Sequence, residues 1–292
     1  MDETRTEAGA PSSAQTATAY GQSPPVPVLP PELVDPLRRD LSEADYTVEG
    51  ITAALGDVAA GAMMRGDLVP ARRVIAGQGG TPLAVLLRLF ALGDAVDEEA
   101  LATAFPRTGA AGVRRVGLVA GVDTGVVATC DLRPYGDESA TWWIASDLGE
   151  ITTGRPLHPD HVLGVGGASL TLAAWTPRLP APRVLDLGTG CGIQALHAAA
   201  QAQEIVATDL SERALAFAAF TAALAQQRWD LRRGICSSPS RPASPTGSTS
   251  SSATRRSSSA RVPSGCRSTS TATAGGPATR WWSRSSAGWA GI

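Results

Sequence analysis

Three glycines and one carboxylate, spread over residues 188–209, are the part of this sequence best suited to hold a ligand. Gly188, Gly190 and Gly192 follow the apolar segment Val184–Leu187, and Asp209 closes a second apolar segment. Glycines in such a turn let the backbone bend sharply and approach a ligand, and a following helix offers unpaired N–H groups. A carboxylate about 20 residues further on can accept hydrogen bonds from ribose hydroxyls. The spacing predicts a site for a nucleoside or dinucleotide.

The elements that must position these residues are a strand, a helix and a second strand. The pattern predicts a buried strand that contains Val184, Leu185 and Leu187, a helix over roughly Gln194–Gln203, and a strand at Ile205–Thr208. This order is the opening β-α-β unit of a doubly wound α/β sheet.

The glycine spacing distinguishes between cofactors. A nicotinamide or flavin fingerprint, G-x-G-x-x-G, needs its third glycine at position 193, where this chain has Ile. The segment D-L-G-T-G-C-G with an acid at the end of the next strand instead resembles class I S-adenosylmethionine-dependent methyltransferases. The resemblance implies a Rossmann-like methyltransferase sheet with S-adenosyl-L-methionine as cofactor. The cofactor contacts that it implies are Asp186, Gly188, Thr189, Gly190, Gly192, Asp209 and Leu210. A nicotinamide-dependent oxidoreductase is the disfavoured alternative.

Neighbouring segments continue this pattern. Ser211 is the expected N-cap of a second helix, and a third strand is expected to begin within residues 227–234. Because several methyltransferases of this kind place a glycine-rich segment over the cofactor, Gly166, Gly167 and Ser169 are weaker candidates for lining the pocket.

The sequence predicts no metal site. His158 and His161 flank Asp160, but no further ligand stands at a suitable spacing, and the four cysteines form no C-x-x-C pair. Free cysteines are the expected state. His197 is expected to be exposed and without a role on the first helix of the cofactor segment.

The chain before the cofactor segment divides by composition. Residues 1–30 are rich in Ala, Thr, Ser, Gln and Pro and predict a disordered leader. Residues 31–150 predict a mainly helical domain, in which Thr47 caps one helix, a buried helix ends at Gly93 and Asp97 begins another.

Strands end this first domain. A hairpin is expected from Val116–Val122 and Val126–Leu132, with T-W-W-I-A-S-D-L as a further strand. Helices followed by a hairpin and a strand resemble a winged-helix arrangement, so the domain either recognises the substrate or only packs. Its charge is not basic enough to favour nucleic acid. Trp142 and Trp143 are expected to pack in the core and between domains rather than to stack on bases.

The second domain, residues 151–234, gives way to a segment with no core-forming pattern. Residues 1–230 carry 27 acidic residues against 16 Arg, whereas residues 231–292 carry nine Arg and no acid. Residues 235–292 form a low-complexity Ser/Arg tail that cannot bury a core, although the sheet still needs strands.

A shift of the reading frame near Gly234 accounts for both observations. With Ser read as TCN and Arg as CGN, the neighbouring frame of Ser248–Ser259 is compatible with F-D-L-V-V-S-N-P-P-F-V-I. That string is an apolar parallel strand followed by N-P-P-F.

The N-P-P-[FY] motif marks the small-methyltransferase-domain group. In that group the Asn side chain and the first Pro carbonyl accept hydrogen bonds from a planar substrate nitrogen, and the aromatic ring stacks on it. The resemblance implies an N-methyltransferase acting on an amide or exocyclic amine of protein, RNA or DNA. In this chain Thr254-Arg255-Arg256-Ser257 stand in place of the motif. We therefore predict no catalytic residues here, weak cofactor binding at best and no turnover.

The alternative from another class is a nucleic-acid-binding protein with a basic tail and a vestigial cofactor fold. No apolar run approaches the length of a membrane span, so no membrane partner is expected. The acidic first residues lack the apolar core of a signal peptide, and the cytoplasm is the expected compartment.

Overall fold

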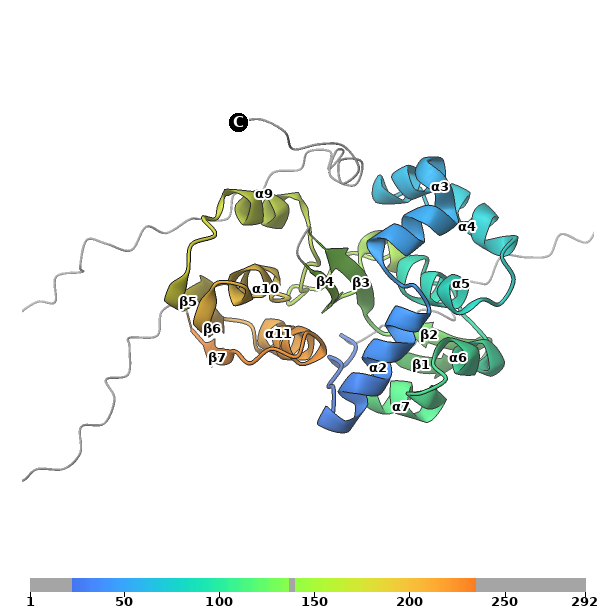
Figure 1. Cartoon of the computed structure of the whole chain (residues 1–292). Helices are drawn as coiled ribbons and strands as arrows, with labels where there is room; N and C mark the ends of the chain where they lie inside the picture. The colour runs from blue at the N-terminus through green and yellow to red at the C-terminus, as the bar shows by residue number, and fades with distance from the viewer. Residues whose placement is uncertain (1–22, 137–139, 235–292) are drawn as a thin grey trace, which may run out of the picture.

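The computed structural model describes residues 23–136 and 140–234, and the predictions for residues 1–22 and 235–292 lie outside these ranges. The described chain is a mixed α/β structure with helices and three small sheets. Figure 1 shows the helices α2 to α7 at one end and the sheet of β5, β6 and β7 at the other, with α11, β3 and β4 between them. No helix of the described residues is both long and apolar enough to cross a membrane.

The first part of the chain is helical, as predicted. Its helices are α2 (Pro31–Glu43), α3 (Val48–Met64), α4 (Val69–Ala76), α5 (Pro82–Leu86), α6 (Glu98–Ala104) and α7 (Gly109–Val116), with a π-helical turn η1 (Leu87–Ala91) extending α5. The predicted caps are confirmed, because Thr47 Oγ1 accepts from Gly50 N at 2.9 Å and Asp97 Oδ1 accepts from Ala100 N at 2.7 Å. Gly93, at φ +68°, ends the buried helix.

Two antiparallel hairpins follow. Strands β1 (Val119–Val122) and β2 (Gly125–Ala128) pair around the predicted turn, and Val96 adds a single bridge to Val126. The sequence predicted one strand over Val126–Leu132, but β2 ends at Ala128 and the next strand begins at Asp131, so two strands replace the predicted one. The backbone N–H of Thr129 donates to Leu118 O at 3.0 Å. A second strand, β3 (Asp131–Gly136), then pairs with β4 (Thr141–Ser146).

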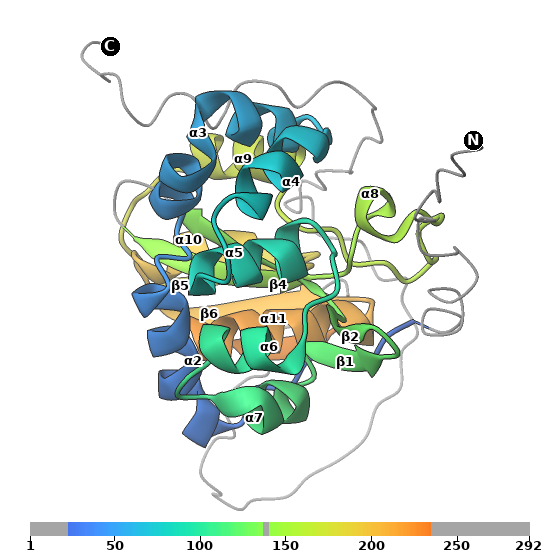
Figure 2. The ribbon, with the colours of Figure 1, turned by 90° about the vertical axis from the view of Figure 1, so that its right-hand side faces the viewer.

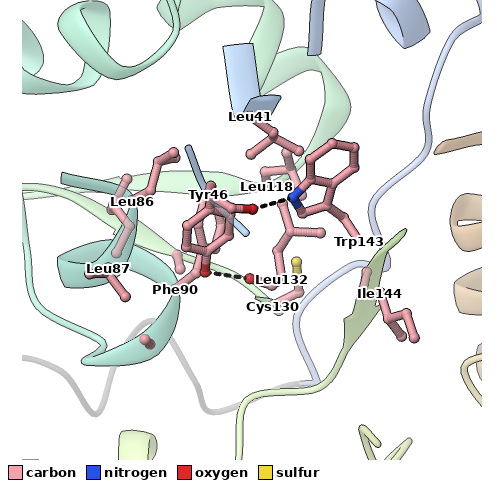
Figure 3. Close-up of a cluster of buried hydrophobic side chains, with 14 of the residues drawn as sticks. Leu41, Tyr46, Leu86, Leu87, Phe90, Leu118, Cys130, Leu132, Trp143 and Ile144 are labelled. Carbon is pink, nitrogen blue, oxygen red and sulfur yellow. Dashed lines mark hydrogen bonds between the residues drawn. The ribbon is translucent and has the colours of Figure 1, made fainter. Parts of the chain in front are cut away.

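Tyr46 and Trp143 join the helices to the second hairpin. Tyr46 is fully buried, and its hydroxyl donates to Leu132 O at 2.7 Å, while Trp143 Nε1 donates to Tyr46 O at 2.7 Å (Figure 3). Both polar atoms are thus paired within an apolar cluster. Burial raises the pKa of Tyr46 far above its usual range. Trp143 has the packing role that the sequence predicted.

The second part of the chain contains a β-α-β-α-β unit. After the helices α8 (Glu150–Thr153) and α9 (Gly167–Trp175), its elements are β5 (Ala181–Leu187), α10 (Ile193–Ala199), β6 (Ala202–Asp209), α11 (Glu212–Leu224) and β7 (Asp230–Arg233). The three strands are parallel in the order β5-β6-β7. The predicted strand, helix and strand are confirmed, although α10 ends at Ala199 instead of Gln203. The predicted third strand is confirmed as β7.

Strand β5 was predicted to be buried, and this is wrong for the described chain. Leu185 and Leu187 remain 46% and 47% exposed. The reason is that β5 pairs only with β6 and forms an edge of the described sheet. On α9, the nearby Trp175 is 82% exposed.

The two parts share one hydrophobic core. Leu196 of α10 and Phe217 and Phe220 of α11 belong to the same buried cluster as Tyr46 and Phe90 of the first part. Figure 2 shows α11 lying behind α6 and below β4 in this view. The division near residue 150 therefore does not separate two independent cores.

The ordered fold begins earlier than predicted. The composition of residues 23–30 predicts part of a disordered leader, but Val28 N donates to Val116 O at 2.9 Å and Leu29 is buried. The apolar residues of V-P-V-L, near the end of the predicted leader, supply this contact.

Candidate functional site

The glycine turn follows β5 directly at the carboxyl end of the parallel strands. Gly188 and Gly190 have φ of +71° and +55°, which L side chains rarely adopt. Two consecutive backbone donors, Gly188 N and Thr189 N, bind Thr208 O on β6 at 2.8 and 2.9 Å. The turn is thus fixed to the end of the neighbouring strand.

Asp209 lies beside this turn, as the spacing predicted. Its Oδ2 accepts from Gly190 N at 3.0 Å, and its Oδ1 accepts from Ser211 N at 2.9 Å. Ser211 caps α11 by accepting from Ala214 N, so the predicted cap is confirmed. The carboxylate is therefore held between the glycine turn and the start of α11.

The three glycines have different surroundings. A Cβ added at Gly188 or Gly190 would meet no atom within 4 Å, so these two residues leave open space for a ligand. A Cβ at Gly192 would lie 2.7 Å from Cζ3 of Trp229. Gly192 thus allows the turn to pack on the indole, and Trp229 is a residue of the site that the sequence reasoning did not identify.

Two polar side chains of the predicted set have buried atoms at this turn. Asp186 Oδ2 and Thr189 Oγ1 have no hydrogen-bond partner among the described residues. Burial raises the pKa of Asp186, and the Thr189 hydroxyl and the Ala195 backbone N–H offset part of that shift. Both oxygens are shielded from solvent by the surrounding protein.

The remaining predicted residues surround the turn. Leu210 follows Asp209 and is 61% exposed, an apolar side chain available at the strand end. Ser169 O accepts from Gln194 Nε2 at 2.8 Å, which joins α9 to α10. Gly166 and Gly167, at the start of α9, have open space in front of their Cα atoms.

Cys191 and Ile193 face the core. Cys191 is a buried free thiol whose pKa burial raises to about 11, and Cys130 is also free and buried. Ile193 is 4% exposed in the place where a nicotinamide fingerprint has glycine.

His197 was predicted to be exposed, and this is wrong. It is 9% exposed, because the β3–β4 hairpin covers this face of α10. Tyr135 Oη lies 2.7 Å from His197 Nε2, and the stacked rings of Tyr135 and Trp142 both meet the imidazole edge-on. Trp142 therefore packs between the two parts of the chain, as predicted.

His158 and His161 line a small cleft of about 40 Å³, together with Asp147 and Arg213. Among the residues that the structure describes, no group of three potential metal ligands is found.

The Asp147–Arg213 pair was also missed by the sequence reasoning. Arg213 lies in the first turn of α11, where the helix dipole disfavours a cation. The unfavourable position of this arginine is the one signal in the sequence that could have suggested a carboxylate partner, although it does not indicate Asp147.

The glycine turn and Asp209 thus lie at the carboxyl ends of neighbouring parallel strands in the three-stranded sheet. Comparison with protein families finds that residues 43–129 match a domain of unknown function, DUF7059. This match covers the helices α3 to α7 and the β1–β2 hairpin, and it ends before the glycine turn. No curated protein matches the chain.

Proposed function

We propose that the intact form of this protein is an S-adenosylmethionine-dependent N-methyltransferase of the N-P-P-[FY] group with a Rossmann-like sheet. The observation that carries the proposal is the hydrogen bond from Gly190 N to Asp209 Oδ2. It joins the glycine turn and the acid of the second strand at one edge of the sheet, next to the open space at Gly188 and Gly190.

The residues present fit such a cofactor. The carboxylate of Asp209 can accept hydrogen bonds from ribose hydroxyls, and Leu210 offers an exposed apolar surface beside it. Asp186 Oδ2 and Thr189 Oγ1, at the same turn, have no hydrogen-bond partner among the described residues. When bound, the cofactor supplies an activated methyl group.

The exposed β5 edge supports the proposed shift of the reading frame. Leu185 and Leu187 have the apolar character of a central strand but are nearly half exposed. The neighbouring frame of Ser248–Ser259 supplies a compatible apolar strand with N-P-P-F. We therefore assign methyl transfer to the frame-restored protein and no turnover to the chain as written.

The first test measures cofactor binding. We expect Asp209→Asn to weaken S-adenosylmethionine binding about tenfold or more, because loss of a charge-assisted hydrogen bond costs roughly 1.5–3 kcal/mol. Glu204→Gln is the matched control, since Glu204 lies on the same strand and makes an exposed pair with Arg183. Equal affinity of the Asp209→Asn variant and the wild type in calorimetric titration would contradict the assignment of Asp209.

The second test measures turnover. The frame-restored protein should transfer a radiolabelled methyl group to a protein, RNA or DNA acceptor, and the 292-residue protein should not. Methyl transfer by the 292-residue protein would show that residues other than N-P-P-F suffice. A DNA sequence whose second frame does not encode N-P-P-F would remove the basis for the frame shift.

A further inference from the structure

The junction between the first part of the chain and the start of α11 contains a buried ion pair. Asp147 follows β4, and its side chain is 8% exposed, while the side chain of Arg213 is 12% exposed. Arg213 Nε donates to Asp147 Oδ2 at 2.8 Å, and Arg213 Nη2 donates to Asp147 Oδ1. Two parallel hydrogen bonds fix the plane and the position of both groups.

The same pair binds two more segments. Asp147 Oδ2 also accepts from Val162 N at 2.9 Å, in the loop that leads to α9. Arg213 Nη1 donates to Pro24 O at 2.8 Å, and its guanidinium lies over the ring of Phe217 at 5.4 Å. One carboxylate and one guanidinium thus join four segments that are distant in sequence.

This junction is connected to the candidate site through the first turn of α11 and the hydrogen bonds of Asp209. Arg213 stands two residues after Ser211, whose N–H donates to Asp209 Oδ1. The other oxygen of Asp209 accepts from Gly190 N. A displacement of the first turn of α11 would therefore displace Asp209 relative to the glycine turn.

Stability alone is a poor explanation for such a pair. Buried ion pairs lose hydration of both charges, and apolar residues of similar volume often replace them without loss of stability. What an apolar pair lacks is the directional, two-bond geometry that sets the orientation of the helix.

We propose that Asp147 and Arg213 are positioning residues for Asp209, so that the first part of the chain is a scaffold for the cofactor site. The cofactor part of this inference rests on the proposed function. The positioning part concerns the free protein and can be measured without any ligand.

The test uses the full 292-residue chain and the conservative change Arg213→Lys, which keeps the charge but removes the two-bond geometry. Amide hydrogen exchange at Gly190 and Ser211 reports the bonds to Asp209. We expect exchange at these two amides to accelerate about tenfold, as for a local opening. Arg72→Lys is the control, because Arg72 also makes two hydrogen bonds to Asp94, in an exposed pair on the helical part of the chain.

A second variant removes the ion pair altogether. In Asp147→Leu with Arg213→Met, apolar packing replaces the pair but leaves Val162 N and Pro24 O without these partners, so we expect a lower unfolding midpoint together with the same faster exchange, measured where the chain remains folded. Unchanged exchange at Gly190 and Ser211 in both variants would overturn the proposal. So would equal acceleration of these two amides in Arg72→Lys.

Titration with S-adenosylmethionine distinguishes this inference from the proposed function. If the wild type binds the cofactor, Arg213→Lys should weaken binding about tenfold under conditions where all variants are folded. A twofold change or less would show that positioning does not reach the ligand and would overturn the scaffold role. If the wild type binds no cofactor but the exchange changes occur, the positioning of Asp209 holds and the cofactor assignment for this chain fails.

Discussion

Gly192→Ala tests the packing of the glycine turn. Gly192 has φ of +90°, and a Cβ there would lie 2.7 Å from Cζ3 and 3.0 Å from Cη2 of Trp229. The left-handed backbone costs alanine roughly 1–2 kcal/mol. Overpacking against the indole adds about 1–3 kcal/mol. We therefore expect the free energy of unfolding to fall by about 2–5 kcal/mol.

Gly188→Ala is the matched control. Its φ of +71° imposes a similar backbone cost, but a Cβ there would meet no atom within 4 Å. The unfolded-state effect of replacing glycine by alanine is the same in both variants and cancels in the comparison. The difference between the two should be about 1–3 kcal/mol, which is the cost of overpacking.

Urea unfolding followed by circular dichroism measures these differences, and the shared core predicts a single transition for both parts of the chain. Trp229→Leu removes the ring atoms that the new methyl group would meet. In a double-mutant cycle the Gly192→Ala cost should therefore fall by about 1 kcal/mol or more in the Trp229→Leu background. Equal losses in Gly188→Ala and Gly192→Ala, with no coupling to Trp229, would refute the packing of the turn on the indole.

Three further predictions use the same chain. Tyr46→Phe leaves the Leu132 carbonyl without its buried donor, so denaturant unfolding should show a loss of about 1–3 kcal/mol, and an unchanged midpoint would contradict the bond. Because burial raises the pKa of Asp186, the folded state binds this proton more tightly than the unfolded state, and the free energy of unfolding should fall as pH rises from the pKa of the unfolded state through the raised pKa of the folded state. Asp186→Asn should remove this pH-dependent decline from the urea midpoints. An unchanged pH profile in the variant would contradict the prediction. Deletion of residues 235–292, which hold Arg but no acid, should abolish any salt-sensitive binding of nucleic acid in gel-shift assays, whereas retained binding would place the contact in the folded part.

The β-α-β order and the glycine turn could be predicted from the sequence because they depend on local rules. Apolar segments of strand length, glycines where φ is positive, and Ser211 before a helix each act within a few residues. The same holds for the caps Thr47 and Asp97. The meeting of Asp209 with the turn followed from the fact that parallel strands end at one edge of a sheet.

What could not be predicted depends on contacts between distant segments. His197 lies on a helix surface that looked exposed, and only the β3–β4 hairpin buries it. The packing of Trp229 on Gly192 and the pairing of Asp147 with Arg213 join residues more than 30 positions apart. The exposure of Leu185 was also unpredictable from its own segment, because it depends on which strand lies beside β5.

Within the residues that the structure describes, β5 leaves one edge of the sheet unpaired, which has a consequence for the behaviour of the protein in concentrated solution. An apolar strand with unpaired backbone groups is a template for strand addition by another molecule, and natural sheets avoid this with proline or charge. β5 carries Pro182 and Arg183 at its beginning and Asp186 near its end, but Leu185 and Leu187 on either side of Asp186 remain exposed. Self-association should therefore increase with protein concentration and should decrease when Leu185 is replaced by a charged residue.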